Sequence, residues 1–156
     1  MSPLRLTLPS PDATARCAAA LGRCLVPGDV LLLDGPVGAG KSHFARALIQ
    51  SLQDIPEDVP SPTFTLVQSY DTSRGTVWHC DLYRMSGPDE LIELGLIEAF
   101  DDAICLIEWP DRLGDLAPAS ALRLVFTPDA EHPDCRHLDI SAPDAHWDSR
   151  LTGFAA

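Results

Sequence analysis

Lysine is almost absent from this sequence of 156 residues, in which Lys41 is the one lysine and the other ten basic residues are arginine. Basic residues as a class are also few, because 11 Lys+Arg stand against 23 Asp+Glu and give a formal net charge of −12. Such a charge repels the phosphates of nucleic acids. We therefore expect no binding of nucleic acid by the chain alone, and no membrane association.

Other features that are missing narrow the class of protein further. No stretch approaches the roughly 18 apolar residues of a membrane span, and the first 12 residues lack a basic region followed by an apolar one. The five cysteines show no C-x-x-C spacing and lie mostly in apolar stretches, which indicates reduced, buried thiols. His132, His137 and His146 lack the spacing of metal ligands. With no repeat and no linker, we expect a single cytoplasmic domain over residues 1–156.

Hydrophobic patterning along the chain alternates between strand and helix signals. Val30–Leu33 is a continuous apolar run, typical of a strand covered on both faces, and a Gly-rich turn follows it directly. After the turn, Phe44, Leu48 and Leu52 recur every four residues, which indicates one apolar helix stripe. We expect strands over 4–8, 30–33, 64–70, 75–83, 103–107, 122–126 and 136–141, and helices over 11–25, 41–53, 88–100 and 144–151.

The Gly-rich turn matches the phosphate-binding loop pattern G-x-x-x-x-G-K-[ST] and lies where that pattern functions, between a buried strand and a helix. In such a loop, backbone N–H groups and the helix N-terminus face phosphate oxygens. Lys41 then reaches the β- and γ-phosphates of ATP, and the Ser42 hydroxyl ligates Mg²⁺. The expected nucleotide-binding residues are Gly35, Pro36, Val37, Gly38, Ala39, Gly40, Lys41 and Ser42. The expected fold is α/β: a three-layer, mostly parallel P-loop NTPase sheet with an antiparallel hairpin and helices on both faces.

Three further residues are candidates for the chemistry of phosphoryl transfer. Glu108 ends an apolar run, as expected of the acid that completes Mg²⁺ coordination, and Asp81 ends another predicted strand. The alternative for each is an ordinary acid at a strand end. Thr63 follows a proline in a loop where nucleotide switches place a hydroxyl that senses the γ-phosphate, or it only forms a turn. We take Lys41, Asp81 and Thr63 as the catalytic candidates, and Ser42 and Glu108 as the metal ligands.

Three residues near these candidates have two interpretations each. His79 shares a strand face with Asp81 and is either a general base or a hydrogen-bonded structural group. Arg84 contacts either a phosphate or a surface carboxylate. Trp109, next to Glu108, either lines the nucleotide site or packs in the core.

Five segments carry a resemblance to a known family: GPVGAGKS (35–42), SPTFTLV (61–67), HCDLYR (79–84), ELIELG (90–95) and IEWP (107–110). Their order and spacing over residues 28–116 resemble the bacterial TsaE family, small P-loop ATPases of the tRNA threonylcarbamoyladenosine pathway. The resemblance implies a Mg²⁺-dependent ATPase, slow without partners, that assists TsaB and TsaD in transferring a threonylcarbamoyl group to the adenosine beside the anticodon.

The same resemblance implies roles for individual residues. Ser42 and Glu108 are similar to the family's Mg²⁺ ligands, Thr63 belongs to a first switch loop, and Asp81 belongs to a second switch near the γ-phosphate. Pro36 departs from the common family pattern and removes one backbone donor from the phosphate cradle. Segments near 10–11 and 130–131 are implied as adenine contacts.

Two other functions compete with this interpretation. A small-molecule kinase needs the same phosphate loop, but it also needs an Arg-rich lid, and the arginines here are dispersed. A nucleotide-gated interaction module would give docking as its output. We expect docking to TsaB and TsaD to depend on ATP, which would order the segments 62–65 and 81–86. A GTPase is disfavoured because the sequence has no N-K-x-D segment.

Overall fold

The computed structural model describes residues 3–60, 66–143, 145–152 and 154. Its strands are β1 (Leu4–Leu8), β2 (Val30–Asp34), β3 (Val67–Thr72), β4 (Gly75–Asp81), β5 (Ile104–Glu108), β6 (Leu122–Pro128) and β7 (Arg136–Ser141). Its helices are α1 (Pro11–Gly22), α2 (Lys41–Ser51), α3 (Pro88–Glu93), α4 (Leu96–Asp102), the 3-10 helix η1 (Pro110–Leu116) and α5 (His146–Arg150).

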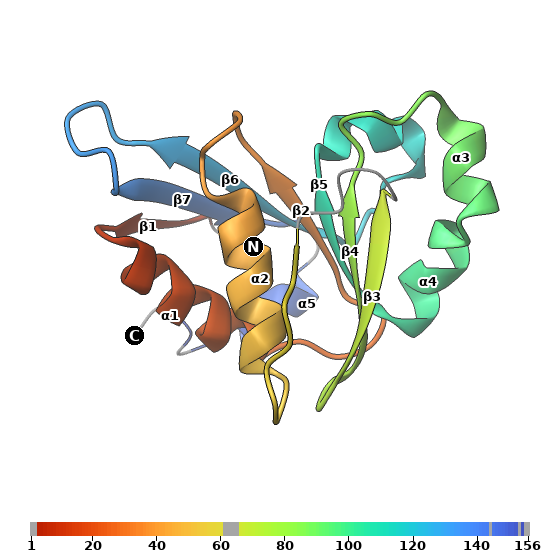
Figure 1. The fold of residues 1–156 in the computed structure, drawn as a ribbon, viewed down its shortest axis with the longest axis horizontal. Coiled ribbons are helices and arrows are strands. Elements are labelled where there is room, and N and C mark those ends of the chain that lie inside the picture. Colours follow the sequence, from red (N-terminus) through yellow and green to blue (C-terminus); the bar gives the residue numbers. More distant parts are fainter. Residues whose placement is uncertain (1–2, 61–65, 144, 153, 155–156) are drawn as a thin grey trace.

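All seven strands belong to one sheet with the order β1-β7-β6-β2-β5-β4-β3 (Figure 1). The four central strands β6, β2, β5 and β4 are mutually parallel. Antiparallel strands flank them on both sides, β3 against β4, and β7 and β1 beyond β6. The predicted α/β class and the hairpin are therefore confirmed, and a second antiparallel region extends the other edge.

The central strands are buried on both faces, as their continuous apolar sequence predicts. Leu31 and Leu33 of β2 join a core cluster with residues of α1 and α2, while Val30 and Leu32 join a cluster with residues of α3 and α4. Successive residues of a strand point to opposite faces, so one apolar run supplies both clusters. This gives the three expected layers and holds the carboxyl ends of β2, β4 and β5 beside one another.

One helix prediction is wrong. The single helix expected over 88–100 is divided into α3 and α4 around Leu94 and Gly95. Gly95 has φ of 78°, in the left-handed region, and a helix commonly ends where glycine adopts it. The hairpin turn is also shorter than expected, because Thr72 pairs with Gly75.

The five cysteines agree with the expectation of reduced thiols. All five cysteines are free thiols, and Cys80, Cys105 and Cys135 are buried. Among the helices that the structure describes, none is both long and apolar enough to cross a membrane.

Candidate functional site

The loop between β2 and α2 has backbone geometry that requires glycine. Gly35 has φ of +142°, and a Cβ there would lie 2.6 Å from the Phe126 carbonyl oxygen. No side chain fits that space without moving β6. The Gly35 N–H donates to Asp34 Oδ1 at 2.8 Å, and Gly40 precedes Lys41, the first residue of α2, with φ of 100°. The loop therefore curls back onto the sheet and directs the start of α2 toward its carboxyl edge.

Lys41 is held inside this curl, although lysine is rarely buried. Its side chain is 5% exposed, its Nζ donates to the Gly35 carbonyl at 2.6 Å, and Nζ lies 3.5 Å from the centre of the Trp109 ring. Burial lowers the pKa of Lys41, while the negative charges of Glu108 and Asp34 act in the opposite direction. The ammonium group has a carbonyl and an aromatic face as partners, and a phosphate would be a stronger one.

The side chains of Ser42, the second residue of α2, and Glu108, the last residue of β5, are in contact. The Ser42 Oγ lies 2.9 and 3.0 Å from the two carboxylate oxygens of Glu108, which is 3% exposed at the end of β5. His79 Nε2 lies 2.7 Å from Glu108 Oε2. A carboxylate only accepts hydrogen bonds, so the hydrogen of His79 is on Nε2. These contacts orient Glu108 toward Ser42 and favour the structural interpretation of His79.

Asp81 stands beside Glu108, because the two residues are register partners across β4 and β5. Its Oδ1 accepts the Tyr83 N–H at 3.0 Å. Burial raises the pKa of Asp81 and the charge of Glu108 adds to the rise, against the lowering effect of the Tyr83 hydrogen bond. A half-buried carboxylate with a raised pKa is a better proton acceptor than an exposed one.

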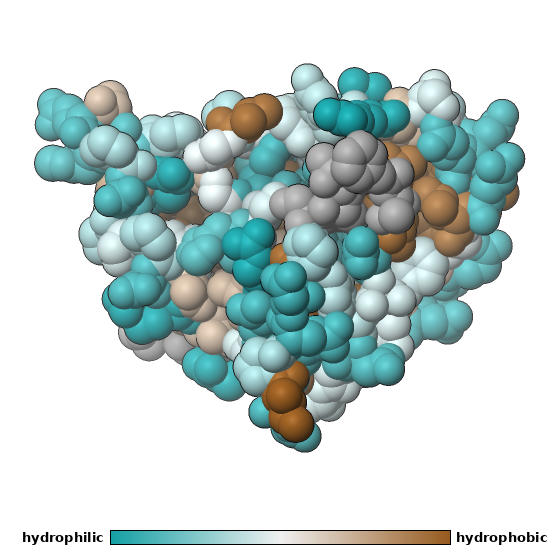
Figure 2. All heavy atoms as spheres, in the orientation of Figure 1, coloured by the Kyte–Doolittle hydropathy of each residue, from teal (hydrophilic) through white to brown (hydrophobic). Residues whose placement is uncertain are grey.

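These side chains surround a cavity of about 470 Å³ that opens to solvent. A volume of this order suits a small-molecule ligand. The face drawn in Figure 2 is mostly hydrophilic, with smaller hydrophobic areas between the hydrophilic residues. The cavity is lined by Val37, Gly38, Gly40, Lys41, Ser42, His43, Asp81, Tyr83, Arg84, Glu108 and Trp109.

The structure brings most of the predicted site residues to this one cavity. Trp109 lines the wall and stacks near Tyr83, with ring centres 5.0 Å apart, and Arg84 is also at the wall. Thr63 lies outside the described residues. The segment 130–131 lies in the connection between β6 and β7 and is not among the residues that line the cavity.

Sequence reasoning missed two residues that shape the phosphate loop. Asp34 accepts a hydrogen bond from the Gly35 N–H and forms an ion pair with Arg123 at 3.2 Å. Its position between an apolar strand and a glycine could have identified it from the sequence. Arg136 at the start of β7 donates to the carbonyl oxygens of Gly38 at 3.1 Å and Ala39 at 2.9 Å. Nothing local in the sequence marks Arg136 as a support of the loop, because its partners in the loop are 97 and 98 residues away.

A second polar group lies outside the cavity. Asp129, Cys135 and His137 offer ligand atoms that all lie within 4.8 Å of one another. The sequence shows no metal-ligand spacing at His137, and the β6–β7 hairpin brings Asp129 close to it by folding back.

Comparisons with known proteins agree with the geometry. A family model described as "Threonylcarbamoyl adenosine biosynthesis protein TsaE" matches residues 8–138, which include every residue lining the cavity. The "tRNA threonylcarbamoyladenosine biosynthesis protein TsaE" of Rickettsia bellii is 38% identical over 117 residues, 75% of this chain and 81% of that protein. The Bacillus subtilis protein of the same name is 36% identical over 127 residues, 81% of this chain and 78% of that protein. The crystal structure of Bacillus subtilis YdiB has a TM-score of 0.79 and 26% identity, covering 99% of this chain and 95% of that one.

Proposed function

Since the chain belongs to the TsaE family of tRNA threonylcarbamoyladenosine biosynthesis, we propose that it is a Mg²⁺-dependent ATPase that supports threonylcarbamoyl transfer by docking to TsaB and TsaD according to its nucleotide state. The observation that carries the proposal is the meeting of Lys41, Ser42 and Glu108 at one cavity. These are a cation, a hydroxyl and a carboxylate, the groups that phosphoryl transfer requires.

The loop between β2 and α2 and the Lys41 side chain bind the triphosphate. The backbone N–H groups at the start of α2 supply donors, and the helix dipole adds partial positive charge. Lys41 exchanges its carbonyl and ring partners for the β- and γ-phosphates. Arg136 occupies the carbonyls of Gly38 and Ala39, which directs those carbonyls away from the anion.

Ser42 and Glu108 fit a hard cation, because their three oxygen atoms already converge within 3.0 Å. Mg²⁺ prefers such oxygen ligands and keeps several waters. When bound there, Mg²⁺ would neutralise charge on the phosphate oxygens. His79 keeps Glu108 in position through the hydrogen bond to its Oε2, as hydrogen-bond partners of metal ligands do.

Asp81 is placed to orient the attacking water. It borders the cavity next to Glu108, and its raised pKa suits acceptance of a proton. Thr63, the other catalytic candidate, is assigned from the sequence alone as the hydroxyl of a switch loop. Hydrolysis then removes the γ-phosphate contacts that order the segments 62–65 and 81–86. The ATP-bound and ADP-bound states therefore present different surfaces.

Docking is the output that the charge of the molecule favours. With a net charge of −12, a tRNA approaching an average face is repelled, whereas a protein partner is not. Tyr83 is 51% exposed and Val37 is 80% exposed at the mouth of the cavity, so apolar contact area lies beside the nucleotide. The segment 81–86 is therefore both a wall of the site and a surface for TsaB or TsaD.

A P-loop kinase for a small molecule is the alternative function. Its lid would bring several arginines over the phosphates, and within the described part of the chain Arg84 is the one arginine that lines the cavity. A kinase would consume ATP in proportion to an added acceptor.

The experiment that tests the proposal measures binding in two arms. Affinity for TsaB–TsaD is compared with an ATP analogue, ADP and no nucleotide, and affinity for tRNA is measured for the protein alone at about 0.15 M salt. We expect partner affinity to differ among the nucleotide states and tRNA binding to be weak. Partner affinity that is indifferent to nucleotide, or submicromolar binding of tRNA, would contradict the proposal.

A further inference from the structure

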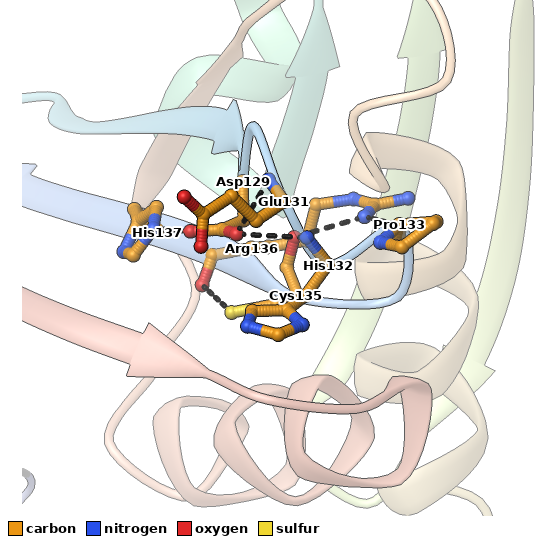
Figure 3. A network of polar contacts seen from close by, with 7 residues as sticks. All are labelled: Asp129, Glu131, His132, Pro133, Cys135, Arg136 and His137. Carbon is orange, nitrogen blue, oxygen red and sulfur yellow. Dashed lines mark hydrogen bonds and ion pairs between the residues drawn. The ribbon is translucent and has the colours of Figure 1, made fainter.

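We propose that Asp129, Cys135 and His137 form a binding site for a thiophilic divalent cation of the zinc class, at the end of the β6–β7 hairpin and separate from the nucleotide cavity. The three residues come from a short segment of chain, and their ligand atoms lie within 4.8 Å of one another. Figure 3 shows them around the loop that joins the two strands.

The hairpin backbone places all three side chains. Cys135 directly precedes β7 and His137 is the second residue of that strand, so the two residues flank Arg136 in the chain. His137 is paired with Thr127 of β6. The Asp129 N–H donates to the Cys135 carbonyl at 3.2 Å, which fixes the third residue opposite the first two. A frame of this kind needs little ordering when a cation binds, so little entropy opposes binding.

One oxygen of the Asp129 carboxylate is held by backbone donors, and the other faces His137. Its Oδ2 accepts the backbone N–H groups of Glu131 at 3.0 Å and His132 at 2.9 Å, while Oδ1 faces His137 Nε2 at 2.8 Å. Backbone donors behind a ligating carboxylate fix its direction as outer-shell partners of metal sites do. The same contacts, with His137 the largest, lower the pKa of Asp129 to about 2, so the carboxylate is ionised at neutral pH.

The separations suit a small ion after a modest adjustment. Zinc binds sulfur at about 2.3 Å and nitrogen or oxygen at about 2.0–2.2 Å, so two ligand atoms on a tetrahedral ion lie roughly 3.3–3.7 Å apart. The Asp129–His137 contact of 2.8 Å therefore lengthens slightly, and the sulfur moves inward from a widest separation of at most 4.8 Å. His137 is 35% exposed and Asp129 21% exposed, which gives an ion access from solvent.

The donor set selects the class of ion. One thiol, one imidazole and one carboxylate suit zinc and related transition ions, whereas Mg²⁺ and Ca²⁺ prefer oxygen ligands alone. On binding, the Cys135 Sγ–H bond breaks, the sulfur forms a bond to the ion, and the proton passes to solvent. The hydrogen that His137 Nε2 donates to Asp129 moves to Nδ1 or to solvent, which frees the Nε2 lone pair for the ion. Three protein ligands leave a fourth position for water.

The site has a direct mechanical link to the phosphate loop. Arg136 stands between two of the ligands, and its guanidinium donates to the carbonyls of Gly38 and Ala39. An ion that fixes Cys135 and His137 therefore also fixes the residue that holds the loop.

The test uses the full-length, metal-free protein in excess Mg²⁺, which saturates oxygen-only sites, with Co²⁺ as the spectroscopic probe and Zn²⁺ as its competitor. We expect one equivalent of Co²⁺ to give a thiolate-to-cobalt charge-transfer band that Zn²⁺ abolishes. Cys135→Ser should lose the band, and His137→Gln should weaken binding by about 100-fold or more, since even outer-shell changes cost 10–100-fold.

The control is Cys17→Ser, because the Cys17 thiol of α1 is half-buried and burial raises its pKa to about 11. This variant should keep the band. Circular dichroism of each metal-free variant checks that it remains folded, and Asp129→Asn supplies a second variant that retains the thiol and should weaken Co²⁺ binding. No charge-transfer band in the wild type, or a band that survives in Cys135→Ser, would overturn the proposal.

Discussion

Lys41 is the residue on which the proposed nucleotide binding depends most directly. It is buried against a carbonyl and an aromatic ring, so its charge is already desolvated before a phosphate arrives. A hydrogen bond to a charged group contributes about 1.5–3 kcal/mol, and removing it should weaken affinity for Mg-ATP about 10- to 100-fold. Calorimetry of Lys41→Ala measures this loss.

The matched control for Lys41 is Arg74→Ala, which removes an exposed positive charge at the tip of the β3–β4 hairpin. Its affinity should equal that of the wild type. Equal affinities of the wild type and Lys41→Ala would show that the loop does not bind the triphosphate. Lys41→Arg should not restore binding, because a planar guanidinium is larger and differently shaped.

Asp81 and Glu108 are neighbours in the sheet, but substitutions at the two positions should affect different steps. Glu108→Gln removes a charge from the expected Mg²⁺ ligand, so Mg²⁺-dependent nucleotide affinity should fall. Asp81→Asn should leave binding largely intact and lower turnover on the order of 10²-fold, by analogy with the loss of single groups from preorganised sites. Steady-state kinetics with TsaB and TsaD present separate KM from kcat. Normal turnover of Asp81→Asn would remove Asp81 from catalysis.

At the scale of residues, the sequence predicted what lies within one strand–loop–helix unit. The phosphate loop has a fixed local spacing, and Glu108 ends an apolar run, so both are visible without the fold. The contact of Lys41 with Trp109 joins α2 to the residue after β5, and the contact of His79 with Glu108 joins β4 to β5. Their distances follow from sheet order, which periodicity does not contain.

Among the elements, β7 supports the phosphate loop through Arg136. Replacing Arg136 by Gln removes donors from the carbonyls of Gly38 and Ala39 and leaves them poorly satisfied. A cost of about 1–2 kcal/mol lowers the melting temperature by about 2–8 °C for a domain of this size. Thermal unfolding followed by circular dichroism measures this change.

The nucleotide affinity of Arg136→Gln should fall as well, because ordering the loop then uses part of the binding free energy of the nucleotide. Arg5→Gln is the control on neighbouring β1, since that side chain is 80% exposed and pairs with Asp139 at the surface. Surface ion pairs contribute about 0–1 kcal/mol, so its effect should be small. An Arg136 variant as stable and as tight in binding as Arg5→Gln would contradict the supporting role of β7.

The β6–β7 hairpin should also set part of the acid stability of the metal-free protein. The pKa of Asp129 is lowered from 3.8 to about 2, chiefly by the hydrogen bond with His137. A depressed carboxylate pKa stabilises the folded state above the unfolded-state value, and this stabilisation is lost as the pH falls through the folded-state value. Asp129→Asn should therefore be less stable than the wild type at pH 5, with the difference shrinking between about pH 4 and pH 2.

Urea unfolding across this pH range measures the effect, with Asp134→Asn, an exposed acid in the same loop, as the control. A difference between Asp129→Asn and the wild type that stays constant from pH 5 to pH 2 would show that the Asp129–His137 contact does not produce the dependence.

At the scale of elements, apolar periodicity predicted the strands and most helices, because burial imposes those periods directly. The division between α3 and α4 was missed, since the apolar residues on either side of Gly95 stay in helical phase. The grouping of Asp129 with Cys135 and His137 was missed because it depends on how a hairpin closes.

For the whole molecule, the proposed function is to bind a nucleotide and to present its state to partners. One seven-stranded sheet carries every residue of the cavity wall on its central strands or the segments that follow them. The net charge of −12 opposes tRNA binding by this chain, so the proposal assigns the holding of tRNA to TsaB–TsaD.

Reconstituted modification of tRNA tests the central claim most directly. TsaB, TsaD, a threonylcarbamoyl donor, ATP and unmodified tRNA are combined with the wild-type chain, with Lys41→Ala, or with neither, and threonylcarbamoyladenosine is counted per TsaD over several turnovers. The account predicts repeated turnover with the wild type, and no more modification with Lys41→Ala than without the chain. Equal multiple-turnover modification with Lys41→Ala and the wild type would contradict it.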